Sequence, residues 1–158
     1  MASTIGKTGG CQCGSIRYQL TGEAIMLYAC HCRDCQQQSS SAFGMSLIVA
    51  GDDLLLLKGS DSLRRWDTRG EDGSIKRCYF CPDCGSRIYH ASDGKDDSIS
   101  VKAGSLDDVG WLRPVAHIWL QSAQPWIEID ENAYACFDRE PKDEADLAQR
   151  WRQLGAMG

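Results

Sequence analysis

The cysteines are the residues of this sequence whose spacing can do chemistry. Eight of the nine fall into three short windows, residues 11–13, 30–35 and 78–84. We expect a chain without an export signal to stay in a reducing compartment, where thiols do not persist as structural disulfides. Clustered cysteines in such a compartment are more often metal ligands or redox catalysts. The three windows therefore predict metal sites.

Cys81 and Cys84 give the strongest metal-binding signal. Tetrahedral zinc holds sulfur at about 2.3 Å, so its ligand sulfurs lie about 3.8 Å apart, a separation that closely spaced cysteines on a tight turn supply. Pro82 sets a turn dihedral and Gly85 tolerates a left-handed one, so the backbone can curl and point its amides at the sulfurs. The residue types in this window therefore predict a zinc knuckle, a tight turn that supplies two cysteine ligands to one zinc ion.

A closed structural site needs four ligands, and Cys11 with Cys13 is the natural second pair. The resulting clip joins segments about 70 residues apart, so metal binding there removes much entropy from the unfolded chain. We predict that a structural zinc staples a modest core through Cys11, Cys13, Cys81 and Cys84.

The middle window differs, because Cys30, Cys32 and Cys35 give three ligands without an obvious fourth. Three protein ligands plus an open position is the pattern of a catalytic zinc, at which water, a thiolate or a carbonyl oxygen binds. The alternative is that the trio recruits Cys78 or His31 and closes into a second structural site. His31 lies between two ligands, and we expect it to point away from them in a surface or supporting role.

Two cysteines stand outside these sets. Cys78 can be a spare buried thiol, a fourth ligand or a redox partner, of which the buried thiol is our expectation. Cys136 is expected to be a small hydrophobic core residue. A thiol redox enzyme would need one of them in an electropositive, exposed setting.

Short strands are the elements that must position these cysteines. Residues 15–21 and 43–49 alternate apolar and polar side chains, as half-buried strands do. Turns rich in glycine and aspartate separate five further expected strands, at residues 54–58, 75–80, 99–103, 115–120 and 126–129. Strands of this length and spacing predict a mainly β fold of curved antiparallel sheets.

The hydrophobic period changes only near the C-terminus. Pro141 can open a short helix there, expected over about residues 142–155. Leu147, Trp151 and Leu154 fall on one face of this helix. Such a stripe usually covers a sheet, so we predict that it packs into the core.

Length and charge exclude several classes of protein. The 158 residues have room for one core, so we expect residues 1–158 to form a single zinc-binding domain. Seventeen basic against 22 acidic side chains leave a net charge of −5, and no nucleic-acid partner is expected.

The longest apolar run, residues 54–57, is far short of the roughly 20 residues that cross a bilayer. Residues 1–10 lack the apolar core of a targeting signal, so we expect a soluble, cytoplasmic protein without a membrane partner.

The motifs resemble those of the glutathione-dependent formaldehyde-activating enzymes, a family that includes the CENP-V-like proteins. The resemblance is carried by residues 9–18 (GGCQCGSIRY), 30–35 (CHCRDC) and 80–86 (FCPDCGS). It continues through the motifs GSLDD, HIW and PW to about residue 130. The resemblance implies a mostly β, Mss4-like fold stapled by zinc, with two zinc ions per chain.

The resemblance implies the same two sets of cysteines, one structural and one catalytic, as the number of sulfur donors in each group does. The structural set matches Cys11, Cys13, Cys81 and Cys84, and the catalytic set matches Cys30, Cys32 and Cys35. The activity that it implies is that of a carbon–sulfur lyase or synthase, which joins a small thiol such as glutathione to formaldehyde as S-hydroxymethylglutathione. The alternatives are a protein-binding module with both zinc sites structural, and a thiol redox enzyme, because the Mss4-like fold also hosts methionine sulfoxide reductases.

Two positions depart from the family pattern. The family often has Ser-Gly after the catalytic trio, whereas Ser39 is followed by Ser40 and Ser41 here, which is expected to alter the backbone beside the zinc. Cys78 stands near a place where relatives often carry a basic residue. The carboxylates of glutathione would need cationic partners, which the sequence leaves open among Arg17, Arg33, Arg77, Arg87 and Lys102.

Overall fold

The computed structural model describes residues 3–70, 73–95 and 97–156, and the chain divides into two compact units. The helical unit consists of residues 25–47 and of the chain from residue 111 onward. The strand unit consists of residues 3–24 and 48–110. The prediction that the whole chain is a single domain stays a prediction.

Strands dominate both units, which confirms the mainly β fold. The described residues form eleven strands in curved sheets, two α-helices and three short 3-10 helices. The helical unit contains β3 (Met26–Cys30), α1 (Arg33–Ser39), the first part of β4 (Gly44–Ala50), β10 (Ala116–Ile118), η3 (Leu120–Ser122), β11 (Ala135–Cys136) and α2 (Ala145–Ala156). The strand unit contains β1 (Thr8–Gly10), β2 (Arg17–Leu20), η1 (Gly51–Asp53), β5 (Leu54–Lys58), β6 (Arg64–Arg69), β7 (Ile75–Phe80), β8 (Arg87–Ser92), β9 (Ser98–Lys102) and η2 (Ala103–Ser105).

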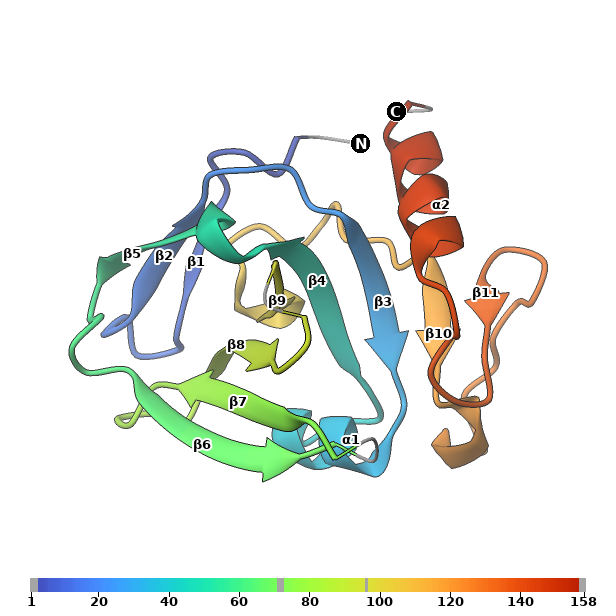
Figure 1. Ribbon diagram of the computed structural model, residues 1–158, viewed down its shortest axis with the longest axis horizontal. Coiled ribbons are helices and arrows are strands. Elements are labelled where there is room, and N and C mark those ends of the chain that lie inside the picture. The colour runs from blue at the N-terminus through green and yellow to red at the C-terminus, as the bar shows by residue number, and fades with distance from the viewer. Residues whose placement is uncertain (1–2, 71–72, 96, 157–158) are drawn as a thin grey trace. The chain divides into compact units, whose positions relative to one another are not determined.

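The sheet of the helical unit includes parallel pairs. Its strand order is β11-β10-β3-β4, and β10 pairs in parallel with β3 and with β11 (Figure 1). The register places His117 opposite Ala29 and Ile118 opposite Cys30. The strand spacing predicted antiparallel sheets throughout. This prediction holds for the strand unit and is wrong for the helical unit. The parallel pairing brings β10 beside the strand that ends at the middle cysteine window.

Helix α2 packs against β3 in the same unit (Figure 1). Leu147 and Trp151 are buried, and the Trp151 ring meets the Trp111 ring edge-on at 6.5 Å. The predicted core stripe is thus confirmed at these two positions. The helix begins at Ala145 and not just after Pro141, because the Asp143 carboxylate accepts a hydrogen bond from the Ala145 N–H at 2.9 Å and so caps the helix there.

The strand unit holds two antiparallel arrays. One has the order β1-β2-β5, and the other runs β9-β8-β7-β6 through consecutive pairings. The strands expected at residues 54–58 and 75–80 are confirmed at those bounds. The strand expected at residues 126–129 is wrong, because Trp126 lies in a turn in which the Ile127 N–H donates to the Gln124 carbonyl at 3.0 Å.

Several motif residues outside the cysteine windows hold the strand unit together. The buried Tyr18 hydroxyl and the Ser105 hydroxyl share a hydrogen bond of 2.8 Å, and burial raises the pKa of Tyr18 to about 12. Arg17 donates to both carboxylate oxygens of Asp107, which lowers the pKa of Asp107 to about 2. A side chain at Gly9 would collide with the Tyr18 hydroxyl, so only glycine fits there. These residues therefore have a structural role.

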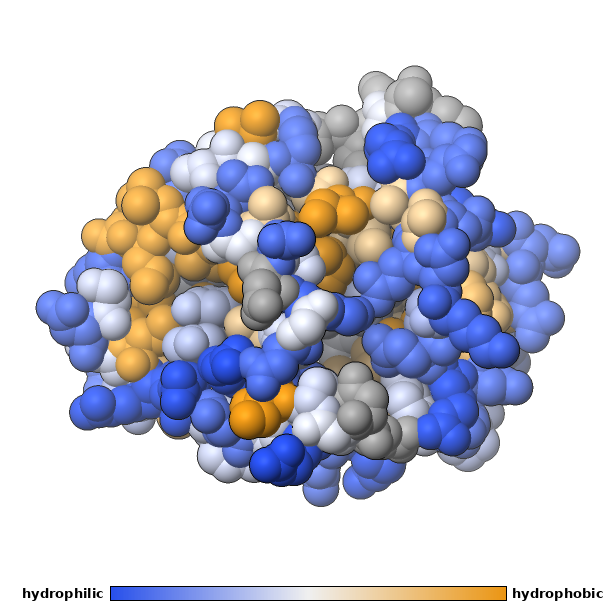
Figure 2. Space-filling model, in the orientation of Figure 1, coloured by the Kyte–Doolittle hydropathy of each residue, from blue (hydrophilic) through white to orange (hydrophobic). Residues whose placement is uncertain are grey.

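Strand β5 lies at the edge of its sheet and exposes apolar side chains. Leu55 and Leu57 are 50% and 54% exposed, and Figure 2 shows the hydrophobic patch over this strand. Within the described part of the chain, no helix has the length and apolar character needed to cross a membrane.

Candidate metal centres

The strand unit brings together the four cysteines predicted to form a closed site. The sulfur atoms of Cys11, Cys13, Cys81 and Cys84 all lie within 4.8 Å of one another. The Cys13 sulfur is 3.5 Å from that of Cys11 and 3.7 Å from that of Cys81. Ligand sulfurs in a tetrahedral zinc site lie about 3.8 Å apart, so this donor set fits zinc without rearrangement.

Two turns aim the backbone of the strand unit at these sulfurs. Gly14 and Gly85 follow the two cysteine pairs with φ of +78° and +76°, and their N–H groups donate to the carbonyls of Cys11 and Cys81. Such left-handed conformations favour glycine. The Ile16 N–H donates to the Cys11 sulfur at 3.1 Å. The expected knuckle geometry is therefore present in both turns.

The four thiols differ in their readiness to ionise. Hydrogen bonds, first from the Ser86 hydroxyl and then from backbone N–H groups, lower the pKa of Cys84 to about 6. Burial raises the pKa of Cys81 to about 12. A buried thiolate needs a cation nearby, so a divalent ion bound by all four sulfurs would favour their ionised forms.

The helical unit brings together the other three cysteines at the junction of β3 and α1. Cys30 ends the strand, Cys32 is the N-cap residue of the helix, and Cys35 lies in its first turn. Their sulfur atoms lie within 4.8 Å of one another, and this group of described donors has three members. The Cys32 sulfur also accepts a hydrogen bond from the Cys35 N–H at 3.4 Å. Both cysteine groups can bind a metal ion.

Crowding of the three thiols disfavours a thiolate in the metal-free chain. Hydrogen bonds to the Cys32 and Cys35 thiols, followed by burial, raise the pKa of Cys30 far above its ordinary value. Three thiols held this close together are a donor set that a bound cation would stabilise in its ionised form.

His31 lies outside this donor group although it separates two of its members in sequence. Its side chain is fully buried, which excludes the surface role, and its Nε2 lies 2.9 Å from Nδ1 of His117. The ring of Phe43 lies 5.2 Å from that of His31. Burial lowers the pKa of both histidines, with the neighbouring His117 adding to the effect on His31. We read the pair as neutral imidazoles that support the cysteine segment.

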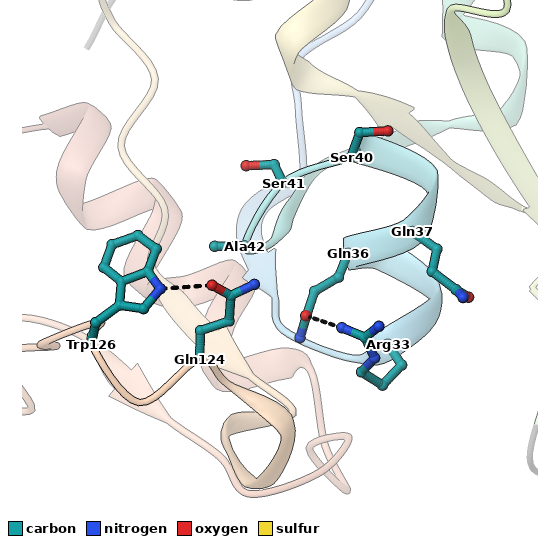
Figure 3. A pocket seen from close by; sticks show the side chains of 8 residues that line it. All are labelled: Arg33, Gln36, Gln37, Ser40, Ser41, Ala42, Gln124 and Trp126. Carbon is teal, nitrogen blue, oxygen red and sulfur yellow. Dashed lines mark hydrogen bonds between the residues drawn. The ribbon is translucent and has the colours of Figure 1, made fainter.

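A polar pocket lies against α1 in the same unit. Its volume is about 380 Å³, and Figure 3 shows the eight side chains that line it: Arg33, Gln36, Gln37, Ser40, Ser41, Ala42, Gln124 and Trp126. Arg33 follows the ligand Cys32 directly, and Gln36 follows Cys35. No local pattern of residues pointed to Gln36 or Gln124, because the pocket joins two segments that are far apart in the chain.

Neither of the two remaining cysteines has the setting of a reactive thiol. Cys78 is fully buried on β7 opposite His90, which confirms the expected buried thiol. Cys136 is half-buried on β11, so it is less enclosed than a core residue. Burial raises the pKa of both thiols. A catalytic thiol needs exposure and a lowered pKa, so these positions do not favour a redox enzyme.

Fold and cysteine geometry together define a mainly β chain with two sulfur-rich sites suited to metal ions. A model of the glutathione-dependent formaldehyde-activating enzyme family matches residues 6–122, and the chain belongs to this family. A crystal structure of a Rhodobacter sphaeroides protein, a structural genomics target, matches with a TM-score of 0.51 at 14% identity, covering 82% of this chain and 98% of that one. At this identity the likeness concerns the fold. No curated protein matches the chain.

Proposed function

We propose that the chain is a zinc-dependent carbon–sulfur lyase or synthase that interconverts formaldehyde plus a small thiol with their hydroxymethyl adduct, glutathione being the thiol. The observation that carries this proposal is the unequal donor count, four sulfurs in the strand unit and three in the helical unit. Family membership supports glutathione and formaldehyde as the reactants. We assign the structural role to the group of four and the catalytic role to Cys30, Cys32 and Cys35.

Zinc is the ion that these donors fit best, at two per chain. Thiolates are soft ligands that select zinc, and all seven donors are cysteine sulfurs. A zinc ion bound by three protein sulfurs supplies a Lewis acid with one open position and stabilises a thiolate. Thiolate ligands persist in reducing compartments, so we place the enzyme in the cytoplasm.

The reaction balances without an added oxidant or reductant. In the synthetic direction the thiol sulfur attacks the carbonyl carbon of formaldehyde, a sulfur–carbon bond forms and the carbon–oxygen π bond opens. The thiol proton ends on the former carbonyl oxygen, which gives the hydroxymethyl thioether. The chain holds the two reactants together, and most of the rate gain is expected from this proximity.

The backbone around the trio keeps its three donors in place. The Cys32 N-cap fixes the start of α1, and the Gln36 side chain donates to the His31 carbonyl at 2.7 Å. The buried His31 and the half-buried His117 that it contacts fill the space beside the segment. These contacts preorganise three sulfurs and contribute no fourth donor, which leaves one position for a reactant.

Exchange spectroscopy by NMR on a mixture of glutathione and formaldehyde tests the proposal. Zinc-loaded protein is expected to accelerate exchange between free thiol and adduct, and Cys32→Ser is expected to abolish the acceleration. Serine is itself a good N-cap residue, so this variant removes a metal ligand and keeps the helix cap. Cys136→Ser is the matched control and should behave as wild type.

Two results would contradict the proposal. No acceleration by the zinc-loaded wild type would remove this pair of reactants. A fourth protein donor found on the metal of the helical unit would make both sites structural and favour the protein-binding module instead.

A further inference from the structure

We propose that the pocket against α1 binds a carboxylate of the thiol substrate and that Arg33 is the residue that meets it. This inference rests on the proposed function, and it adds the residue that meets a carboxylate of glutathione. Arg33 would then determine specificity without taking part in the bond-making step.

Arg33 lines the pocket as an exposed side chain, and a hydrogen bond to a buried glutamine restrains it. Arg33 donates through Nη1 to Oε1 of Gln36 at 2.5 Å, and the Gln36 side chain is only 4% exposed (Figure 3). The Gln36 Nε2 donates to the carbonyls of His31 and Ser122 at 2.7 and 2.9 Å, which fixes the orientation of the amide. Gln36 therefore turns its oxygen toward Arg33 and restrains an otherwise flexible cation.

The geometry of a guanidinium suits the role. It carries five N–H donors in a planar fork, so one hydrogen bond to Gln36 leaves enough donors for a bidentate carboxylate. An arginine that is held in advance loses less side-chain entropy when a ligand binds. The restrained Arg33 is thus prepared for a planar anion.

The remaining walls of the pocket favour an anion with a peptide character. No acidic side chain is among the described residues that line it, although the chain as a whole carries a charge of −5. The Trp126 indole N–H donates to Oε1 of Gln124 at 2.6 Å, so the Gln124 amide nitrogen remains the donor at that wall. The hydroxyls of Ser40 and Ser41 complete a lining that can bind peptide groups.

The pocket and the three-cysteine group are built on one segment. Arg33 follows Cys32, Gln36 follows Cys35, and the carbonyl that Gln36 binds belongs to His31, which lies between two cysteines. Because α1 has only seven residues and is roughly 10 Å long, a thiol anchored in the pocket by its carboxylate would have to span only a short distance to bring its sulfur to the three cysteines. Anchoring a remote group in this way contributes to positioning of the reacting atom.

The other arginines weighed as carboxylate partners have different roles in the strand unit. Arg17 is bound to Asp107, and Arg77 donates to Asp93 at 2.5 Å. The Arg87 guanidinium lies 5.6 and 5.5 Å from the centres of the Trp66 and Phe80 rings. Arg33 is the arginine of this set that lines the pocket.

Kinetics of the zinc-loaded protein with two thiols test the inference. Arg33→Gln is expected to raise the KM for glutathione about tenfold, the loss expected when a charged hydrogen bond is removed, while kcat stays close to wild type. The rate with 2-mercaptoethanol, which has no carboxylate, should not change. Arg33→Lys should recover part of the lost affinity. Arg113→Gln removes the same charge from an exposed position in the same unit and should change nothing.

A binding measurement separates this inference from the proposed activity. S-methylglutathione keeps both carboxylates and has a blocked sulfur, so it reports on the pocket alone. We expect it to shift the Trp126 indole N–H signal of wild type, assigned with Trp126→Phe, and not that of Arg33→Gln. The indole signals of the other tryptophans show whether the Arg33→Gln protein is folded.

The possible failures are distinguishable. If wild type accelerates the reaction and Arg33→Gln has an unchanged KM for glutathione, the carboxylate site is wrong and the activity stands. If S-methylglutathione binds through Arg33 in a protein that does not accelerate the reaction, the site stands and the activity is wrong. Equal losses with glutathione and 2-mercaptoethanol would make Arg33 a structural residue and overturn the inference.

Discussion

The two cysteine groups differ in what surrounds them as well as in donor number. The group in the strand unit lies between two turns that end in left-handed glycines, and backbone N–H groups point at its sulfurs. The group in the helical unit lies where a strand passes into a helix whose next residues line a polar pocket. We propose that the four donors of the strand unit act as a staple and that the three donors beside a pocket bind a ligand.

Removing a donor from the strand unit should have the largest effect on stability. Cys81→Ser is expected to lose the structural ion, and since structural zinc contributes on the order of 10 kcal/mol to folding, the variant should unfold well below wild type or fail to fold. Thermal unfolding combined with zinc content measures this. A Cys81→Ser protein as stable as wild type would show that the staple is not needed.

Removing a donor from the helical unit should affect activity and spare the fold. Cys32→Ser is expected to lower kcat/KM at least about 100-fold, while its unfolding free energy stays within about 1 kcal/mol of wild type because serine keeps the cap. Steady-state kinetics and urea unfolding give the two numbers. A collapse of stability like that of Cys81→Ser would erase the difference between the two sites.

A buried histidine gives the strand unit an acid sensitivity that does not come from its metal ligands. His90 is 5% exposed, and burial, followed by the charges of Lys102, Lys76 and Arg87, lowers its pKa to about 2. Between pH 6.5 and 2 the unfolded chain binds a proton that the folded chain excludes, so stability falls as the pH falls. His90→Gln should remove a slope of up to about 1.4 kcal/mol per pH unit below pH 6.5.

Comparing wild type with His90→Gln isolates the contribution of His90 to the pH dependence of stability, because the cysteine ligands are the same in both proteins. Urea unfolding between pH 5 and 8 measures the slope. Above pH 7.5 the two pH profiles should run parallel, since the imidazole is neutral in both states there. Parallel profiles over the whole range would show that His90 does not titrate on unfolding.

The smallest effect concerns the turn after α1. Ser40 is the C-cap residue with φ of 50°, a left-handed conformation that costs a non-glycine residue roughly 1 kcal/mol. Ser40→Gly is therefore expected to stabilise the protein by about 0.5–1 kcal/mol. The neighbouring Ser41→Gly, outside that conformation, should stabilise nothing. The urea midpoints of the two variants measure these effects. Equal shifts for Ser40→Gly and Ser41→Gly would contradict the inferred strain at Ser40.

The sequence predicts the metal sites better than the elements between them. Ligand geometry depends on spacing within a few residues, so the members of both cysteine groups could be predicted from the sequence. In the structure the sulfurs of each group lie close together. Strand β6 escaped prediction because its charged residues are mostly exposed and show no apolar alternation. Helix α1 escaped because seven mostly polar residues carry no apolar stripe.

The surroundings of the three-cysteine group depend on pairings that no local pattern shows. His117 meets His31 because β10 lies parallel to β3, a contact across 86 residues of sequence. Trp126 looked like part of an apolar strand, and it is instead a 70% exposed pocket wall. The serine in the place of a family glycine was visible in the sequence, and Ser40 adopts the left-handed backbone that favours glycine.

Zinc content and sulfur coordination of the wild-type protein, purified under reducing conditions, test the contrast between the sites most directly. We predict two zinc ions per chain, with an average of about 3.5 sulfur ligands by X-ray absorption that rises toward four when glutathione is added. One ion per chain, with Cys30, Cys32 and Cys35 open to alkylation in the presence of excess zinc, would contradict the account and leave only the stapled strand unit.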